Sequence, residues 1–249
     1  MRLIVLGCAG SFPGPEAACS SYLVEAGGFR LLVDFGTGAL GALQRYANIN
    51  AVDAVVLSHL HADHILDASS YVVARRYAPE GPYPSIPVYG PAGTRDRLTA
   101  IYGSSGEGPL DDVYEFHTIE AGTRQIGTFD VTFDRVNHPV ETYGMRIEHD
   151  GRSLAYSADT APCDALVRLA QGADAFLCEA SYLDGMDNPP NLHLTGREAG
   201  EHATKAGVGK LLLTHLVQAW GSESLTIEDA RSTFDGPVEV VRPGSRFQI

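Results

Sequence analysis

Long apolar runs, closely spaced cysteines and an excess of basic side chains are all missing from this 249-residue sequence. No apolar stretch approaches the roughly 20 residues that a transmembrane helix needs, so we expect no membrane span. The cysteines have no paired short spacing, and we expect each to be a small buried hydrophobic residue. They are Cys8, Cys19, Cys163 and Cys178. The chain runs from Met1 straight into the strand-like segment RLIVLG without a signal peptide, which favours a cytoplasmic location.

The charge balance bears on the kind of partner. The sequence has 31 acidic and 18 basic residues and a formal net charge of −13. Proteins that grip a long stretch of nucleic acid usually have the opposite balance, so an extended nucleic-acid partner is a poor candidate. A small anionic substrate remains compatible with this charge, because bound metal cations invert the local potential inside a cleft.

Short apolar segments bounded by glycine or polar turns predict strands in both halves of the chain. The predicted strands span residues 2–7, 21–25, 29–35, 54–58, 87–90, 115–119, 129–137, 143–148, 153–157, 175–179, 210–214 and 238–241. The predicted helices span residues 38–46, 65–76, 163–171, 195–206 and 226–233, and Thr195 with Glu198 forms a capping box. Strands that arrive partly as hairpins and partly through helical crossovers predict mixed sheets covered by helices, in one domain of residues 1–249.

Three imidazoles and one carboxylate fall within the short segment SHLHADH. It follows an apolar strand, and its coordinating residues are His59, His61, Asp63 and His64. Zinc prefers imidazole nitrogen and carboxylate oxygen, and a strand-to-helix loop directs alternate side chains to different sides. One histidine alone would indicate a surface or core residue, whereas four such groups at this spacing predict metal binding.

Further candidate ligands follow later apolar strands. They are His138 in RVNHPV, Asp159 in YSADT and His215 in LLLTHL. Strand ends present side chains to an active-site cleft, and a carboxylate there is able to bridge two cations. Singly, each residue is as consistent with an ordinary loop position; together with the first motif, they predict a site for two divalent metal ions.

In this order, SHLHADH, NHPVETYGMRI, YSADT and LLLTHL resemble the metal motifs of the metallo-β-lactamase superfamily over nearly the whole chain. The resemblance implies an αββα sandwich of two mixed β-sheets flanked by helices. It also implies that one metal ion is held by His59, His61 and His138, a second by Asp63, His64 and His215, and that Asp159 bridges them. Zinc is the implied metal, with manganese as the alternative, and water activated by the metals is the implied nucleophile, oriented by Asp63.

Two further resemblances concern proton transfer and support of the metal loop. The segments FLCEASYLDG and NLHLTGREAG resemble the ribonuclease Z-like branch, which implies that Glu179 and His193 assist proton transfer at a phosphodiester. The alternative for His193 is capping of the helix near Thr195. DFGTG resembles the early aspartate motif, in which Asp34 supports the metal loop without binding metal; the alternative is a turn or a helix cap.

The substrate prediction depends on departures from ribonuclease Z. That enzyme carries a long basic arm between its third histidine motif and the next aspartate motif, whereas residues 138–159 contain only two strands and a turn at Asp150 and Gly151. The continuation HLVQAWGSES also departs from the family's pattern. Closer resemblance, in VLGCAGSFPGPEAACSSYLVE and DFGTGALGALQRYA, is to the actinobacterial cyclic-AMP phosphodiesterases of this fold.

We therefore predict a metal-dependent phosphodiesterase that opens 3′,5′-cyclic AMP, or a related cyclic nucleotide, to the 5′-monophosphate. The alternatives are a ribonuclease Z-type tRNA 3′-processing endonuclease, a thioesterase or lactonase, and a metal-binding protein without catalysis. The ribonuclease Z-like resemblance also implies a homodimer. His117, His149 and His202 match no motif, and we expect them on the surface or in the core.

Overall fold

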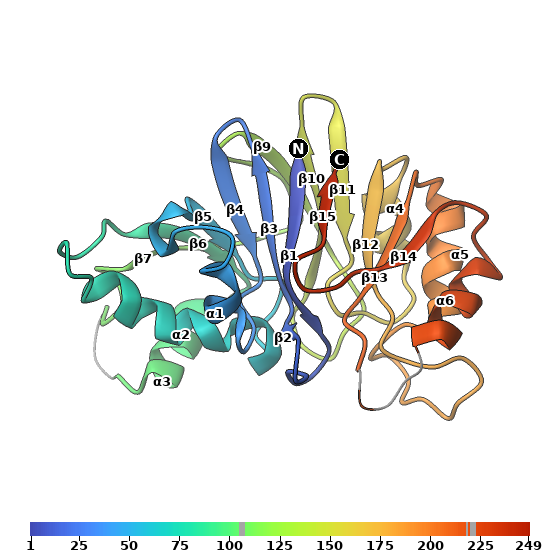
Figure 1. The fold of residues 1–249 in the computed structure, drawn as a ribbon, viewed down its shortest axis with the longest axis horizontal. Helices are drawn as coiled ribbons and strands as arrows, with labels where there is room; N and C mark the ends of the chain where they lie inside the picture. Colours follow the sequence, from blue (N-terminus) through green and yellow to red (C-terminus); the bar gives the residue numbers. More distant parts are fainter. Residues whose placement is uncertain (105–107, 218, 220–222) are drawn as a thin grey trace.

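The computed structural model describes residues 1–104, 108–217, 219 and 223–249, and it contains two β-sheets packed face to face (Figure 1). In spatial order the first sheet consists of β15 (Arg246–Gln248), β1 (Arg2–Ala9), β3 (Ser21–Ala26), β4 (Phe29–Val33), β5 (Ala54–Val56), β6 (Ile86–Gly90) and β7 (Tyr114–Thr118), with β2 (Ala18–Cys19) beside β1. The second consists of β14 (Val238–Val240), β13 (Leu211–Thr214), β12 (Ala175–Glu179), β11 (Arg152–Tyr156), β10 (Tyr143–His149), β9 (Phe129–Arg135) and β8 (Gly122–Ile126).

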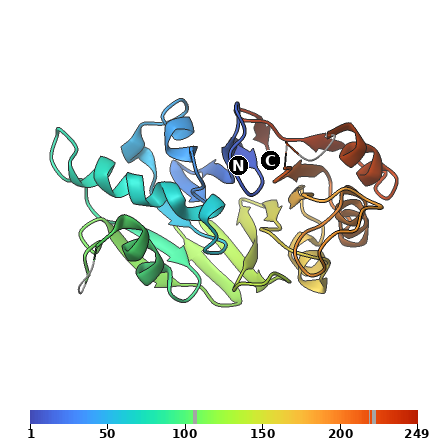
Figure 2. The same cartoon turned by 90° about the horizontal axis from the view of Figure 1, so that it is seen from below.

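Helices cover the outer face of each sheet. Figure 1 shows these layers side by side, and Figure 2 shows them from below. The first sheet carries α1 (Ala39–Leu43), α2 (Ala62–Arg76) and α3 (Thr94–Tyr102), and a short 3₁₀ turn at Ile49–Ala51 precedes β5. The second sheet carries α4 (Asp164–Ala170), α5 (Gly196–Ala206) and α6 (Glu223–Arg231). The structure confirms the predicted αββα sandwich of two mixed sheets.

Alternate residues of the central strands explain the layering. In β1, Leu3 and Val5 face the core between the sheets, whereas Ile4 and Leu6 face the helices. In β13, Leu212 faces the other sheet, and its neighbours face α5 and α6. Strands buried on both faces read as continuous apolar runs. The predicted capping box at the start of α5 is confirmed, since the Thr195 hydroxyl accepts from the backbone of Glu198.

Strand directions place the ends of several strands at one edge of the sandwich. β4 and β5 are parallel in the first sheet, and β11, β12 and β13 are parallel in the second. β1 pairs antiparallel with β3, which pairs antiparallel with β4, so β1 runs in the same direction as β4. By the same argument through β10, β9 runs in the same direction as β11. The loops that follow these strands contain Asp34, the SHLHADH segment and the later candidates, which therefore converge from different parts of the sequence.

Among the described residues, no helix is long and apolar enough to cross a membrane. The termini lie side by side, because β15 pairs with β1 and the backbone of Ile249 bonds to Met1. Part of the predicted departure in HLVQAWGSES, residues 218 and 220–222, lies outside the described residues. The single domain, the homodimer and the cytoplasmic location stay predictions.

Candidate metal centre

The SHLHADH segment occupies the junction between β5 and α2. Residues 57–61 form the connection after β5, and His61, which has an extended backbone, is the N-cap of α2. The helix was expected to begin at Ile65, but it begins at Ala62, so Asp63 and His64 lie on its first turn and not in the preceding loop. A carboxylate is favourable at this end of a helix, where unpaired backbone N–H groups give a partial positive charge.

Histidines from two loops and one aspartate form the first candidate cluster. His61 Nδ1 and His138 Nε2 are 3.2 Å apart. His59 Nε2 lies 3.7 Å from Asp159 Oδ2. One ligand atom from each of these four residues falls within 4.8 Å of the others. The structure therefore brings together the three histidines that the family resemblance implies for one metal ion and the implied bridging residue, Asp159.

The second cluster contains Asp63, His64, His215 and the same Asp159. Nε2 of His215 lies 3.2 Å from Asp63 Oδ2 and 3.2 Å from Nε2 of His64. Nε2 of His64 is 3.2 Å from Asp159 Oδ1, and Nε2 of His215 is 3.3 Å from Asp159 Oδ2. In this cluster Oδ1 of Asp159 faces His64 and Oδ2 faces His215. Asp159 also belongs to the first cluster. All seven predicted ligands meet in one place.

Unsatisfied atoms at the centre fit a metal ion. His59 and His64 are fully buried and Asp159 is 2% exposed, yet within the described part of the chain Nε2 of His59 has no hydrogen-bond partner, and Oδ1 of Asp159 has only the ion-pair contact with Nε2 of His64. Buried polar atoms without partners are costly, and buried carboxylates are normally paired with a cation. Imidazole nitrogens and carboxylate oxygens are the donors that zinc and similar divalent ions prefer. These clusters are therefore able to bind metal.

The protonation states agree with coordination in the first cluster. Burial lowers the pKa of His59, His61 and His138, which keeps their imidazoles neutral and able to donate lone pairs. For His64, burial lowers the pKa, but the carboxylates of Asp159 and Asp34 raise it well above the usual value. The two carboxylates thus favour positive charge at His64.

Neighbouring acceptors fix which nitrogen of each histidine faces the centre. His138 Nδ1 donates to the backbone oxygen of Leu192 at 3.0 Å. His64 Nδ1 donates to Asp34 Oδ2 at 2.8 Å. In both residues the Nε2 lone pair is left for a metal ion. A histidine ligand normally has its other nitrogen held in this way.

The Asp34 carboxylate bonds to the SHLHADH segment and belongs to neither ligand cluster of the described residues. Besides His64, its carboxylate accepts from the backbone and hydroxyl of Ser58 and from the hydroxyl of Tyr156. The side chain is fully buried, and α1 begins at Ala39, after the N-cap Gly38. These contacts fit the expectation of a supporting aspartate; the alternative of a helix cap is wrong, whereas the φ of 57° at Asp34 also fits the alternative of a turn.

Glu179 and His193 form a hydrogen-bonded pair at the edge of the centre. Nδ1 of His193 lies 2.8 Å from Glu179 Oε1, and its ring centroid is 5.5 Å from that of His215 and 5.7 Å from that of His138. Burial lowers the pKa of His193, but the Glu179 carboxylate raises it to about 9 overall. Thr195 and Glu198 cap α5, so His193 is not required for capping.

Comparison with known proteins identifies the family. Residues 29–216 match the model of the beta-lactamase superfamily domain. The chain belongs to the metallo-β-lactamase superfamily. The probable metallo-hydrolase YhfI of Bacillus subtilis is 31% identical over 252 residues, with 98% of each chain covered. Its crystal structure superposes with a TM-score of 0.88 at 30% identity, covering 99% of this chain and 98% of YhfI.

Two mycobacterial relatives also match along the whole chain. Protein ML1173 of Mycobacterium leprae is 46% identical over 255 residues, covering 100% of this chain and 89% of that protein. Ribonuclease Z of Mycobacterium bovis is 32% identical over 278 residues, covering 100% of this chain and 98% of that enzyme. The chain is thus a member of a metallo-hydrolase family whose relatives include a ribonuclease.

Some residues of this metallo-β-lactamase site escaped the sequence reasoning. The backbone N–H of Ser11 donates to Asp63 Oδ2 at 2.9 Å; such a backbone contact leaves no residue-type signal. The Ser181 hydroxyl lies 2.8 Å from His215 Nδ1 and 2.9 Å from Glu179 Oε2. Ser181 therefore joins a predicted ligand, His215, to the Glu179–His193 pair. Its position two residues after Glu179 was an available signal.

Residues predicted to lie outside the metal centre do so. His117 stacks on Tyr89, His149 lies near the backbone oxygen of Thr128, and His202 is buried in α5. All four cysteines are free; three are buried, whereas Cys163 is partly exposed beside the start of α4 and corrects the expectation of a buried residue.

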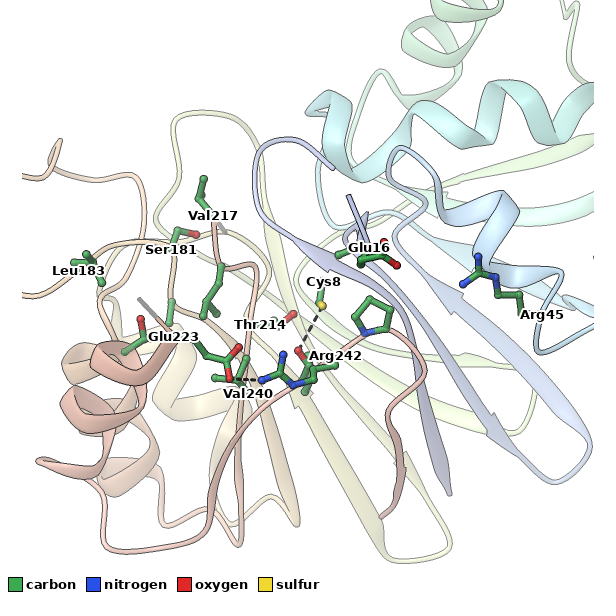
Figure 3. A pocket seen from close by; sticks show the side chains of 16 residues that line it. Cys8, Glu16, Arg45, Ser181, Leu183, Thr214, Val217, Glu223, Val240 and Arg242 are labelled. Carbon is green, nitrogen blue, oxygen red and sulfur yellow. Dashed lines mark hydrogen bonds and ion pairs between the residues drawn. The ribbon is translucent and has the colours of Figure 1, made fainter. Parts of the chain in front are cut away.

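Two cavities adjoin the metallo-β-lactamase centre. One, of about 470 Å³, is lined by His193 and Ser11 and by the loop that follows β12. The other, of about 600 Å³, lies between β1 and β14, where Arg242 is paired with Glu223 (Figure 3). Neither a predicted metal ligand nor a member of the Glu179–His193 pair is among the described lining residues of the second cavity. The first cavity is therefore the better candidate for substrate binding.

Proposed function

We propose that this metallo-hydrolase is a phosphodiesterase that uses two divalent metal ions to convert 3′,5′-cyclic AMP, or a related cyclic nucleotide, to the 5′-monophosphate. The observation that carries the proposal is the His193–Glu179 pair, 2.8 Å apart, beside histidines of both metal clusters. Opening of a phosphodiester ring releases an alkoxide that needs a proton, and an imidazolium held by a carboxylate is a suitable donor.

The proposed roles follow from the contacts of each residue. Metal ions held by the seven ligands would neutralise phosphoryl charge and activate water. Glu179 stabilises the protonated form of His193, and His193 donates its proton to the departing 3′ oxygen as the bond from phosphorus to that oxygen breaks. The bond from phosphorus to the oxygen of the attacking water, which has released one proton to solvent, replaces it. Asp63, held by the backbone of Ser11, would bind metal and orient the water.

A ribonuclease Z-type activity is the second candidate, and the 32% identity to Mycobacterium bovis ribonuclease Z favours it. The interval between His138 and Asp159 argues against it, because this fully described segment contains β10, β11 and a turn at Asp150 and Gly151. That interval adds no arm able to neutralise tRNA phosphates, and the net charge of −13 adds no general attraction. A thioesterase or lactonase would leave the His193–Glu179 pair without a role.

The deciding experiment compares substrates with one enzyme preparation. Cyclic AMP and a tRNA precursor are each incubated with the protein at low salt and with added zinc or manganese. We expect turnover of cyclic AMP and little or no cleavage of the precursor. Endonucleolytic cleavage at the 3′ side of the tRNA without turnover of cyclic AMP would replace the proposal with the second candidate. A thioester assayed in parallel tests the remaining alternative.

A further inference from the structure

The cavity beside His193 is preformed by a loop that hydrogen bonds hold in place. This loop, residues 181–192, connects β12 to α5. The backbone N–H of Tyr182 donates to Leu194 at 3.0 Å, which fixes the loop's base. The side-chain amide of Asn188 donates to the backbone oxygen of Leu183 at 2.8 Å, which closes its tip. A cavity of about 470 Å³ between this loop and Ser11 falls within the usual range for small-molecule sites.

The lining of this cavity is mostly apolar and carries little charge. Leu183, Met186, Pro189 and Leu192 contribute apolar surface, and Met186 is 65% exposed. No lysine or arginine is among its described lining residues. Apart from His193, the described lining therefore has no basic side chain to hold a second phosphate, and a polynucleotide is a poor occupant. An uncharged, flat group fits better, since thioether sulfur and aliphatic side chains pack well on aromatic rings.

Polar groups at the tip of the loop add a preference. Asp187 is an exposed residue with a carboxylate, and the hydrogen bond from the Asn188 side chain to Leu183 uses the amide nitrogen, not the oxygen. Both residues line the cavity and offer acceptor oxygens. A heteroaromatic base with an exocyclic amino group provides the matching donor.

We propose that this cavity binds the nucleobase of the substrate, with Met186 and Leu183 against the ring and the acceptors at Asp187 and Asn188 facing its amino group. The inference rests on the proposed function, because it needs a nucleotide whose phosphodiester lies at the metal centre. His193 lines the same cavity and belongs to the proton-transfer pair, so one ligand can occupy both places. The base would then contribute to substrate affinity, not to the chemical step.

The test places a carboxylate in the cavity without disturbing the core. Met186→Glu changes an exposed side chain, and Val73→Glu, at a residue of α2 that is 48% exposed, is the matched control. Kinetics are measured with cyclic AMP and with a methyl riboside 3′,5′-cyclic phosphate, which has no base. We expect Met186→Glu to raise KM for cyclic AMP about tenfold, through lost packing and burial of charge, with kcat and the base-free substrate unaffected. Val73→Glu should match the wild type.

The outcomes separate the two proposals. A wild-type enzyme that hydrolyses neither cyclic phosphate overturns the proposed function. A wild-type enzyme that hydrolyses cyclic AMP, together with a Met186→Glu variant of unchanged KM, overturns only the base-binding cavity. Saturation-transfer NMR with 5′-AMP gives a second readout: we expect the adenine protons to receive more saturation than the ribose protons, and the difference to disappear in Met186→Glu. Stronger saturation of the ribose would contradict the assignment.

Discussion

Asp34→Asn tests whether support of the metal loop depends on one buried carboxylate. Oδ2 of Asp34 accepts from His64, Ser58 and Tyr156 at 2.8–2.9 Å, and Oδ1 accepts from the backbone of Ser58 at 2.7 Å. Asparagine has nearly the same shape and also tolerates the left-handed backbone, which has a φ of 57° here. The substitution therefore changes charge and hydrogen bonding with little change in backbone strain.

The expected cost follows from those four bonds. If the asparagine oxygen replaces Oδ2, three bonds lose the charge of their acceptor, and the amide nitrogen faces the backbone N–H of Ser58. A bond to a charged group contributes about 1.5–3 kcal/mol and a neutral one about 1 kcal/mol, and an unsatisfied buried donor costs about 1–3 kcal/mol. Removal of a buried charge offsets part of this loss. We expect the free energy of unfolding of the metal-free protein to fall by about 2–4 kcal/mol, and metal affinity to fall about 10–100-fold.

Urea unfolding of the metal-free protein and competition with a chromophoric chelator measure the two quantities separately. Asp150→Asn is the matched control, because Asp150 has a similar φ of 50° but a side chain that is 89% exposed. An exposed change of this kind should alter stability by less than about 0.5 kcal/mol. If Asp34→Asn binds metal and unfolds as the wild type does, the carboxylate does not hold the loop and the reasoning fails.

Three further predictions concern the centre itself. Removal of metal by a chelator should lower the melting temperature and abolish turnover, and both should return with zinc or manganese, because the ligands bind metal only when folded; an unchanged melting curve would contradict metal binding. His193, with a pKa raised to about 9, must be protonated to donate, so activity should fall as pH rises past that range. Glu179→Gln should shift this loss of activity to lower pH at equal metal content. An unchanged pH dependence above neutrality would show that Glu179 does not stabilise protonated His193. Gly36→Ala would place a Cβ 1.9 Å from the backbone oxygen of Asp63, whereas Gly41→Ala meets nothing within 4 Å; metal content measured by mass spectrometry should fall only in the former.

The candidate ligands could be found from sequence because each follows an apolar strand whose direction the fold fixes. His138, Asp159 and His215 are distant in sequence but follow β9, β11 and β13, which run the same way in one sheet. These residues lie at one edge of the sheet because their strands run in the same direction. The order of the motifs along the chain was enough to predict this arrangement. Backbone contacts such as that of Ser11 with Asp63 depend on three-dimensional approach and have no local signature.

The missed elements lack a hydrophobic period. β8 is the edge strand of the second sheet, and only Ile126 of its five residues is buried. α3 lies at the periphery and buries Thr94 and Leu98 alone. β15 has three residues, of which Phe247 is buried. An element at the edge of the fold that buries only one or two side chains has too short a pattern of apolar and polar residues to be recognised from sequence. Strands covered on both faces have continuous apolar runs and are recognised easily.

Backbone strain at the centre links the fold to the site. Asp34, Ala158 and His215 have positive φ values of 57°, 53° and 58°, although none is glycine. All three lie just after buried strands, and Asp34 and Ala158 are fully buried. Such conformations cost about 1–3 kcal/mol each and persist only where the surrounding structure determines them. Two sheets, each packed on both faces, provide that constraint. The sharp turns at Asp34 and His215 direct these two side chains toward the centre, and the turn at Ala158 does the same for the next residue, Asp159. The same strain explains why the ligands converge without a long loop, since a relaxed strand end would carry the chain past the edge of the sheet.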